Sequence, residues 1–214
     1  MDGICQVKKI NGKEWVLFEN DFDDELTPEI IEFLSKHNKI RFPWDSYFNK
    51  SVNNLPNSIT HLYFGSWFNQ PVNRFPDSLL DLEFGLHFNQ LVDNLPNSLT
   101  HLEFGYGFNQ PINFLPDSLK YLKLGSNFNQ SLENLPASLI RIEFGDMYDK
   151  PITDLPNNIR EIKIGRYMDE KILKKFPLSL QKLIVPGDIY HAYENRTDKI
   201  KVPDHVEIEE FYYD

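Results

Sequence analysis

The chain has 214 residues, of which 22 are basic and 32 acidic, giving a formal net charge of −10 at pH 7. This balance disfavours a general affinity for nucleic acid or an anionic membrane, because both require clustered lysine and arginine. The single cysteine, Cys5, excludes an internal disulfide, and without a long apolar run we expect neither a signal peptide nor a membrane-spanning helix, but a cytoplasmic protein.

The N-terminal region predicts a β-hairpin followed by a helix. Residues 4–18 hold two β-forming runs that flank Asn11-Gly12, a pair that favours the positive φ angles of a type I′ turn. An apolar face after Thr27, a typical N-cap residue, predicts a helix over residues 28–37. Because this region lies outside the repeats, we expect residues 1–38 to form an N-terminal cap.

Residues 39–185 repeat with a period of 20 residues, and one unit, residues 95–113, reads LPNSLTHLEFGYGFNQPIN. The segment LTHLEF alternates apolar and polar residues, which predicts a short strand with its apolar side chains pointing inward. The rest of the unit is too short and too rich in proline for a regular helix. The period predicts a right-handed solenoid similar to leucine-rich repeats, with a parallel sheet on its concave face and short turns and extended segments on its convex face.

After the repeats, residues 186–214 lose the pattern and are expected to form a C-terminal cap or an acidic tail. Val206, Ile208 and Phe211 alternate with polar residues, so this segment can pair as a strand over the last rung. The glutamates between them are expected to face solvent.

The recurring segments FNQPI and LPxSLxxLxFG resemble the FNIP repeat, a relative of leucine-rich repeats that is abundant in social amoebae and in giant DNA viruses that infect amoebae. The resemblance covers about residues 39–185 and implies a protein-binding solenoid, in the host-cell cytoplasm if the protein is viral. Many family members carry an N-terminal F-box that recruits a ubiquitin-ligase scaffold. Here the corresponding region begins with a hairpin, and only residues 26–31 faintly resemble an F-box.

Two columns of the repeat are assigned to the fold. A phenylalanine spine is expected to stack in the core with rings about 4.8 Å apart. An asparagine ladder is expected to satisfy backbone groups of adjacent turns. It is expected to weaken toward the C-terminus, where Asp149 and Asp169 can accept but not donate a hydrogen bond. The spine is Phe48, Phe68, Phe88, Phe108 and Phe128. The ladder is Asn49, Asn69, Asn89, Asn109 and Asn129.

Two further columns are also given structural roles. The serine two residues after each proline turn is expected to hydrogen-bond locally to the backbone. The glycine that follows each strand, such as Gly105, is expected to adopt a conformation that other residues avoid. The serines are Ser58, Ser78, Ser98, Ser118, Ser138 and Ser179.

Function is expected where the repeats differ from one another. The outward strand positions and the turn after each strand carry aromatic and hydrogen-bonding groups, a composition that is typical of protein interfaces. We therefore predict a protein partner that binds the concave face and its adjacent turn edge. The predicted contacts are His61, Tyr63, Trp67, Asp81, Glu83, Leu86, His87, His101, Glu103, Tyr106 and Tyr121.

Other interpretations remain open. The outward run Glu103, Lys123, Glu143 and Lys163 alternates in sign and equally suits a self-neutralising solvated face. The alternative function is a structural or assembly protein that self-associates through its ends or its C-terminal tail, and the oligomeric state stays open.

An enzyme is not expected, since the chain has no phosphate-binding loop, paired metal motif or uniquely placed nucleophile. His61 and His101 are two rungs apart, about 10 Å, which is too far to share a metal ion. We accordingly expect no cofactor and no metal.

Overall fold

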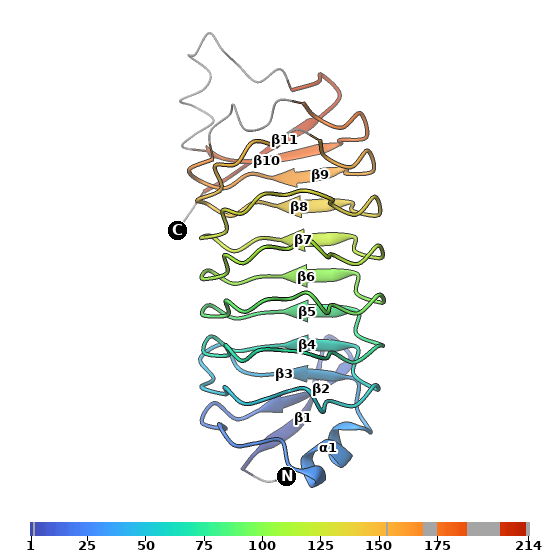
Figure 1. Ribbon diagram of the computed structural model, residues 1–214, viewed down its shortest axis with the longest axis vertical. Coiled ribbons are helices and arrows are strands. Elements are labelled where there is room, and N and C mark those ends of the chain that lie inside the picture. The colour runs from blue at the N-terminus through green and yellow to red at the C-terminus, as the bar shows by residue number, and fades with distance from the viewer. Residues whose placement is uncertain (2, 153, 169–174, 188–201, 213–214) are drawn as a thin grey trace.

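The computed structural model describes residue 1 and residues 3–152, 154–168, 175–187 and 202–212. The chain winds into a column of stacked rungs, and each rung adds a strand to one continuous sheet (Figure 1). The sheet has 11 strands in chain order, from β1 at one end of the column to β11 at the other. This is a parallel-strand solenoid of the leucine-rich-repeat type, as the 20-residue period predicts.

The strands of the repeats are three residues long, shorter than the predicted six-residue segment. They are β3 (Lys39–Arg41), β4 (His61–Tyr63), β5 (Asp81–Glu83), β6 (His101–Glu103), β7 (Tyr121–Lys123), β8 (Arg141–Glu143) and β9 (Glu161–Lys163). Each pairs in parallel with the next and places equivalent residues opposite one another, as Leu82 and Leu102 are. Because the sequence period is strict, equivalent residues of successive repeats line up along the axis of the column.

The N-terminal hairpin extends the sheet beyond the repeats. Strands β1 (Cys5–Ile10) and β2 (Lys13–Phe18) pair antiparallel, and β2 pairs in parallel with β3. The turn residues Asn11 and Gly12 have φ angles of 49° and 75°, the positive values that a type I′ turn requires. The hairpin therefore lies at the end of the column, against the first rung.

Helix α1 (Pro28–Leu34) lies beside the hairpin at the same end of the column (Figure 1). The Thr27 side chain accepts a hydrogen bond from the Ile30 amide and so caps the helix. The helix ends three residues before the predicted position 37, where the His37 amide donates to the carbonyl of Leu34 in a tighter turn.

At the opposite end, β10 (Lys182–Pro186) pairs in parallel with β9 and with β11 (Glu207–Phe211). Ile208 lies opposite Leu183, so the segment around Ile208 does form a strand over the last rung. Residues 188–201, 213 and 214 of the expected C-terminal cap lie outside the described residues.

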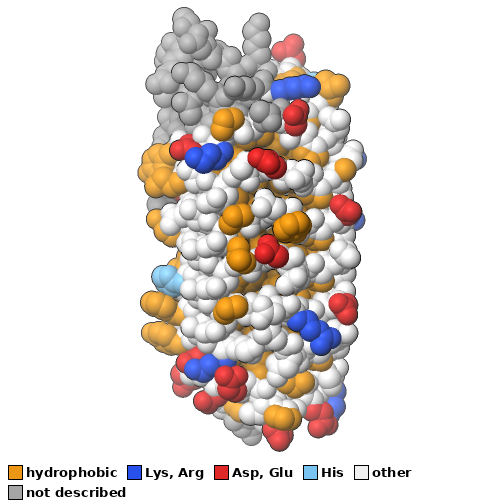
Figure 2. All heavy atoms as spheres, in the orientation of Figure 1, with side chains coloured by type: hydrophobic (Ala, Val, Ile, Leu, Met, Phe, Trp, Pro, Cys, Tyr) orange, Lys and Arg blue, Asp and Glu red, His pale blue; other side chains and the backbone are white. Residues whose placement is uncertain are grey.

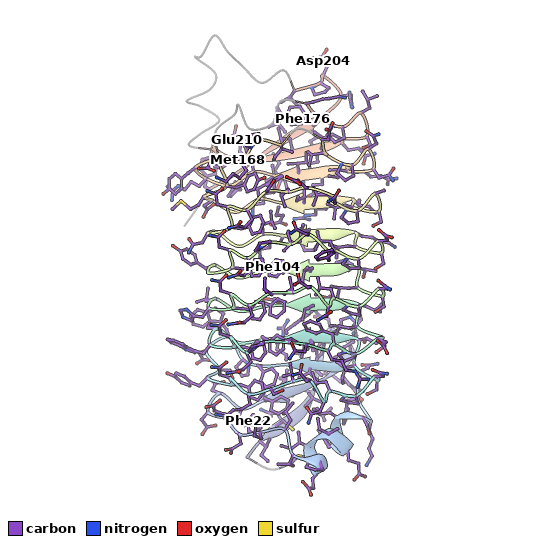
Figure 3. All side chains as sticks on the ribbon, viewed as in Figure 1. Phe22, Phe104, Met168, Phe176, Asp204 and Glu210 are labelled. Atoms are coloured by element: carbon purple, nitrogen blue, oxygen red, sulfur yellow. The ribbon has the colours of Figure 1, made fainter. Side chains whose placement is uncertain are left out.

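The interior of the column is filled by apolar side chains from every rung. Phe22, Phe104 and Met168 mark its lower, middle and upper parts (Figure 3). Successive spine rings are 6.0–6.2 Å apart between centroids, and their planes differ by 4–7°. The spacing between spine rings exceeds the predicted 4.8 Å. Each spine ring from Phe68 to Phe108 also stacks on the phenylalanine of the strand end in its own rung, with centroids 3.7–3.8 Å apart.

The asparagine ladder uses one contact repeatedly. In each rung the side-chain Oδ1 accepts a hydrogen bond from the backbone amide of the asparagine in the next rung, at 2.9 Å for four successive amides. The sequence does not indicate its first member, which is Asp23, whose Oδ1 accepts from the Asn49 amide at 2.9 Å. Because the recurring contact needs only an acceptor, aspartate can supply it at this position. The expected weakening toward the C-terminus stays a prediction, because position 169, which follows Asp149 in the ladder, lies outside the described residues.

The serines behave differently from the local prediction. The hydroxyl of Ser98 donates to the carbonyl of Leu79 in the preceding rung at 2.6 Å, and Ser118, Ser138 and Ser179 make the equivalent contact. Serine therefore ties one rung to the next, because the stacked turns bring a main-chain acceptor within reach of the hydroxyl.

The glycine column also has a different cause from the one predicted. No glycine of this column has a positive φ; among the described glycines only Gly3 and Gly12 do. Instead, a Cβ atom at Gly105 would overlap the carbonyl oxygen of Gly85, and the same overlap recurs from rung to rung. Glycine is needed here because the backbones of successive rungs approach too closely for any side chain.

Candidate protein-interaction surface

The predicted contact residues fall on two surfaces. We call the outward side of the strands the sheet face. It carries His61, Tyr63, Asp81, Glu83, His101, Glu103 and Tyr121. The row of side chains in the turns that follow the strands is called the turn edge. It carries the predicted residues Trp67, Leu86, His87 and Tyr106.

The first part of the sheet face is an aromatic and cationic cluster. Trp15 of β2 packs against His61 and Tyr63 of β4, with ring centroids 5.8 and 5.0 Å apart. The Arg41 guanidinium lies 4.8 Å from the Tyr63 ring centroid, at cation–π distance. The Tyr63 hydroxyl donates to Oδ2 of Asp81 at 2.9 Å. These side chains already have partners within the protein.

Lys39 joins this cluster beneath His61. It is only 8% exposed, and its Nζ lies 2.7 Å from Nε2 of His61. Burial, and then the Lys39 charge, lower the pKa of His61, so the imidazole is neutral at pH 7 and can accept a hydrogen bond from the ammonium group. The sequence patterns do not identify Trp15, because the hairpin carries no repeat from which to infer its register, nor Lys39, whose partner His61 lies on the next strand.

The middle of the sheet face is acidic but partly neutralised. Burial raises the pKa of Glu83, and the neighbouring Glu103 raises it further. Nζ of Lys123 lies 3.0 Å from Oε2 of Glu103. Burial alone would lower the pKa of Lys123, but the attraction of Glu103 and other carboxylates outweighs burial and raises it. His101 is the exposed residue among the predicted contacts of this region, with its Nδ1 2.9 Å from the Thr100 hydroxyl.

The last part of the sheet face is an ion-pair network centred on Glu143, which is 7% exposed. Glu143 accepts a hydrogen bond from Tyr121 at 2.9 Å and pairs with Arg141, which also pairs with Glu161 at 3.1 Å. Nζ of Lys163 lies 3.9 Å from Glu143. Burial, and then Glu103 and Glu143, raise the pKa of Tyr121. The alternating charges here pair with one another, as a self-neutralising face requires, but Glu143 at the centre is buried and not solvated.

The turn edge is more exposed than the sheet face. Trp67 is 49% and Tyr106 is 55% exposed. Trp67 stacks on His87 with centroids 4.4 Å apart and on Tyr47 with centroids 6.0 Å apart. Leu86 is half-buried. Figure 2 shows hydrophobic side chains and a histidine along the left border of the column.

Three further residues belong to the turn edge, although they are not among the contacts that the sequence predicts. Tyr47, Met147 and Tyr167 are 61%, 49% and 65% exposed. Each immediately precedes the spine position of its rung, as Trp67 and His87 do. The position before each spine residue, followed through all the repeats of the sequence, therefore identifies these three residues as well. The turn edge is therefore defined as Tyr47, Trp67, Leu86, His87, Tyr106, Met147 and Tyr167.

Within the described residues, no group of three or more histidine, cysteine, aspartate or glutamate side chains is placed to hold a metal ion. The described part of the chain also contains no helix with the length and apolar character needed to cross a membrane.

Comparison with known proteins places these features in a family. The FNIP Repeat model matches five overlapping segments, residues 48–87, 71–107, 88–127, 108–147 and 128–166. Together they span residues 48–166, more than half of the 214 residues. No curated protein matches the chain.

Among solved structures, the chain is similar to the crystal structure of CroV588, described as a novel circular LRR protein structure. The TM-score is 0.69 and the sequence identity is 28%. The match covers 98% of this chain and 35% of CroV588, so this chain spans about a third of that protein's length.

Proposed function

This chain belongs to the FNIP repeat family, and from that premise we propose that it is a protein-interaction module whose partner binds along the turn edge. A solenoid of this type suits a binding role, because its stacked rungs hold a long row of side chains in fixed positions. The binding surface is the turn edge, and the ligand is a folded protein.

The observation that carries the proposal is the stacked and exposed aromatic row at the turn edge. Tyr47, Trp67 and His87 lie on successive rungs and stack ring to ring. Large apolar side chains that gather on a surface are characteristic of protein interfaces, where tyrosine and tryptophan contribute most of the binding energy. Stacking also holds the rings in place before a partner arrives, which reduces the entropy lost on binding.

The state of the sheet face supports placing the contact at the turn edge. The polar groups of its side chains are already engaged inside the protein. His61 is hydrogen-bonded to Lys39, Tyr63 to Asp81 and Tyr121 to Glu143. A partner that used these groups would first have to break internal contacts, whereas the turn-edge rings offer their exposed edges at no such cost. Of the predicted sheet-face contacts, exposed His101 is the residue best suited to extend the interface.

The N-terminal region does not support the narrower role of an F-box adaptor. An F-box consists of several helices, whereas the described residues before β3 contain one helix, α1, and a hairpin. A link to ubiquitination would therefore require another part of the protein or of its partner.

The test is affinity capture from host-cell lysate with the wild type, the double variant Trp67→Ala/Tyr106→Ala and the control Phe114→Ala. Phe114 is 68% exposed and lies in a different turn of the rung, so it matches the loss of an exposed ring. We expect the wild type and the control to capture the same proteins and the double variant to lose them. Equal capture by all three would show that the turn edge is not the contact surface.

A further inference from the structure

We propose that the partner protein contacts the N-terminal end of the turn edge with arginine side chains. Such a contact rests on the proposed function and specifies the chemistry that the partner's surface must have. Two features of the first rung support it: an additional exposed tryptophan, and a group of acidic side chains beside that tryptophan.

The turn after β3 is longer than the turns that follow the later strands. Residues 43–47 separate the strand end from the spine here, whereas residues 65–67 do so in the next rung. The longer turn carries Trp44, whose side chain is 74% exposed. The Trp44 carbonyl accepts hydrogen bonds from the Ser66 amide at 2.8 Å and from the Ser66 hydroxyl at 2.6 Å. The backbone that carries this exposed ring is therefore held in place by the next rung.

The faces of the Trp44 ring are uncovered. Among the described residues, no aromatic ring stacks on Trp44 and no cation lies over it. By contrast, Trp67 is stacked against its neighbours, and Trp15 has Lys39 and Arg41 at 5.3 and 5.2 Å from its ring centroid. Of the aromatic side chains, tryptophan binds a cation over its face most strongly. An uncovered tryptophan face at the surface thus favours a positively charged group of a partner.

The segment that packs against this turn is acidic. The Asn20 carbonyl accepts a hydrogen bond from the Tyr47 amide at 3.3 Å, and the Asn20 side chain donates to Asp45 at 2.8 Å. Asp23 accepts from the Asn49 amide at 2.9 Å. These contacts hold the exposed carboxylates of the segment beside the turn. We call this group the acidic rim, and it consists of Asp21, Asp24, Glu25 and Asp45.

The charge of the acidic rim is not neutralised within the described residues, where no basic side chain forms a salt bridge with its members. Lys50, which contacts the same segment, is already paired with Asp23 at 3.1 Å. In Figure 2, acidic side chains gather directly below the hydrophobic side chains of the left border of the column. A partner that binds the turn edge therefore gains from positive charge at this end, because complementary charges attract across an interface.

Arginine is the side chain that uses both features at once. Its guanidinium is planar, so it can lie flat on an indole ring, and its N–H groups match a carboxylate in bidentate geometry. The lysine ammonium is a strongly hydrated point charge without this geometry. The sheet face contains the same combination, since Arg141 lies 5.2 Å from the Tyr121 ring centroid and pairs with Glu161 at 3.1 Å.

The experiment is an NMR titration of the full chain with a short peptide that alternates arginine and glycine. The chain has three tryptophans, whose indole N–H signals report separately, and the variant Trp44→Ala identifies the Trp44 signal. We expect the peptide to shift the Trp44 signal and to leave the signal of Trp15, which is 8% exposed, unchanged. A matched lysine peptide should bind roughly tenfold more weakly, and a matched glutamate peptide should not bind.

Charge reversal at the acidic rim is the second arm. Asp21→Lys/Asp24→Lys should weaken binding of the arginine peptide roughly tenfold, because two attractive contacts become repulsive. The control Asp93→Lys/Asp117→Lys makes the same change in net charge at exposed positions in the turns that precede β6 and β7. It should bind the peptide like the wild type. Circular dichroism checks that each variant is folded.

Three results would overturn the proposal: a Trp44 signal that the arginine peptide does not shift, a lysine peptide that binds equally well, or equal weakening by the two double variants. Lysate capture separates this proposal from the proposed function. If Trp67→Ala/Tyr106→Ala loses the captured proteins and Asp21→Lys/Asp24→Lys retains them, the turn edge is the contact surface but arginine is not what it binds. Capture that survives Trp67→Ala/Tyr106→Ala would instead remove the proposed function.

Discussion

Tyr148 occupies the spine position that follows Phe128, and its hydroxyl carries a polar atom into the core. It stacks on Phe128 with centroids 6.2 Å apart and is fully buried. Its hydroxyl has no hydrogen-bond partner among the described residues, and burial raises its pKa to about 12. A buried hydroxyl without a partner loses its hydration and gains nothing in return.

Tyr148→Phe should therefore increase the free energy of unfolding by about 1 kcal/mol, because it removes the desolvated hydroxyl and keeps the ring. Tyr121→Phe is the matched control: the same atom is removed, but there it donates to Glu143, so stability should fall by about 1 kcal/mol. Urea unfolding of both variants measures the difference. A change of the same sign in both would contradict this account of Tyr148.

At the scale of elements, the rung is held to its neighbours by contacts that no single rung could make. The Ser98 hydroxyl reaches the carbonyl of Leu79, and Gly105 allows its backbone to approach that of Gly85. Each strand from β3 to β9 is only three residues long, so these turn contacts add substantially to the hydrogen bonds of the sheet. The rung is thus a unit that is stable only when stacked.

Gly105→Ala tests this close approach. Its Cβ would overlap the backbone of the preceding rung, which cannot yield as a flexible side chain would, so we expect a loss of about 3 kcal/mol or more. Gly12→Ala is the contrasting case: its φ of 75° is strained for alanine but no atom lies within 4 Å, so the cost should be about 1 kcal/mol. Thermal unfolding distinguishes them, and equal losses would show that conformation, not contact, selects glycine in the column.

At the scale of the whole molecule, one chain of side-chain acceptors links the N-terminal region to the repeats. It begins with Asp23, which bonds the Asn49 amide, and continues from rung to rung as far as the Asp149 amide, which donates to Asn129 at 3.1 Å. The glutamine after the ladder asparagine reinforces it, since Nε2 of Gln130 donates to Oδ1 of Asn109 at 3.1 Å. The column is stabilised along its length by this repeated contact.

Asn109→Ala should cost about 1 kcal/mol, because the Asn129 amide loses its acceptor within a partly buried turn. Asn109→Asp should cost less, since the carboxylate keeps the acceptor that the ladder uses, as Asp23 does at its start. Chemical denaturation of the two variants gives the comparison. If aspartate were as damaging as alanine, the donor side of the amide would also be essential.

The sequence by itself determined the architecture, because a 20-residue period with inward leucine and phenylalanine can bury its apolar side only by stacking rung on rung. It also separated the inward from the outward positions, since each buried row, such as the one through Leu102, follows from strand alternation alone.

Only the tertiary structure decided what the outward residues do. Trp15 covers His61 and Tyr63 because the hairpin adds its strand to the sheet, and no periodicity predicts that register. Glycine after each strand is required by the carbonyl of a neighbouring rung, a contact that forms only once the rungs are stacked. The repeat period of the sequence specifies which residue types recur along the chain. Contacts between rungs, and between the hairpin and the first rungs, depend on distances that are set only when the chain has folded into a stack.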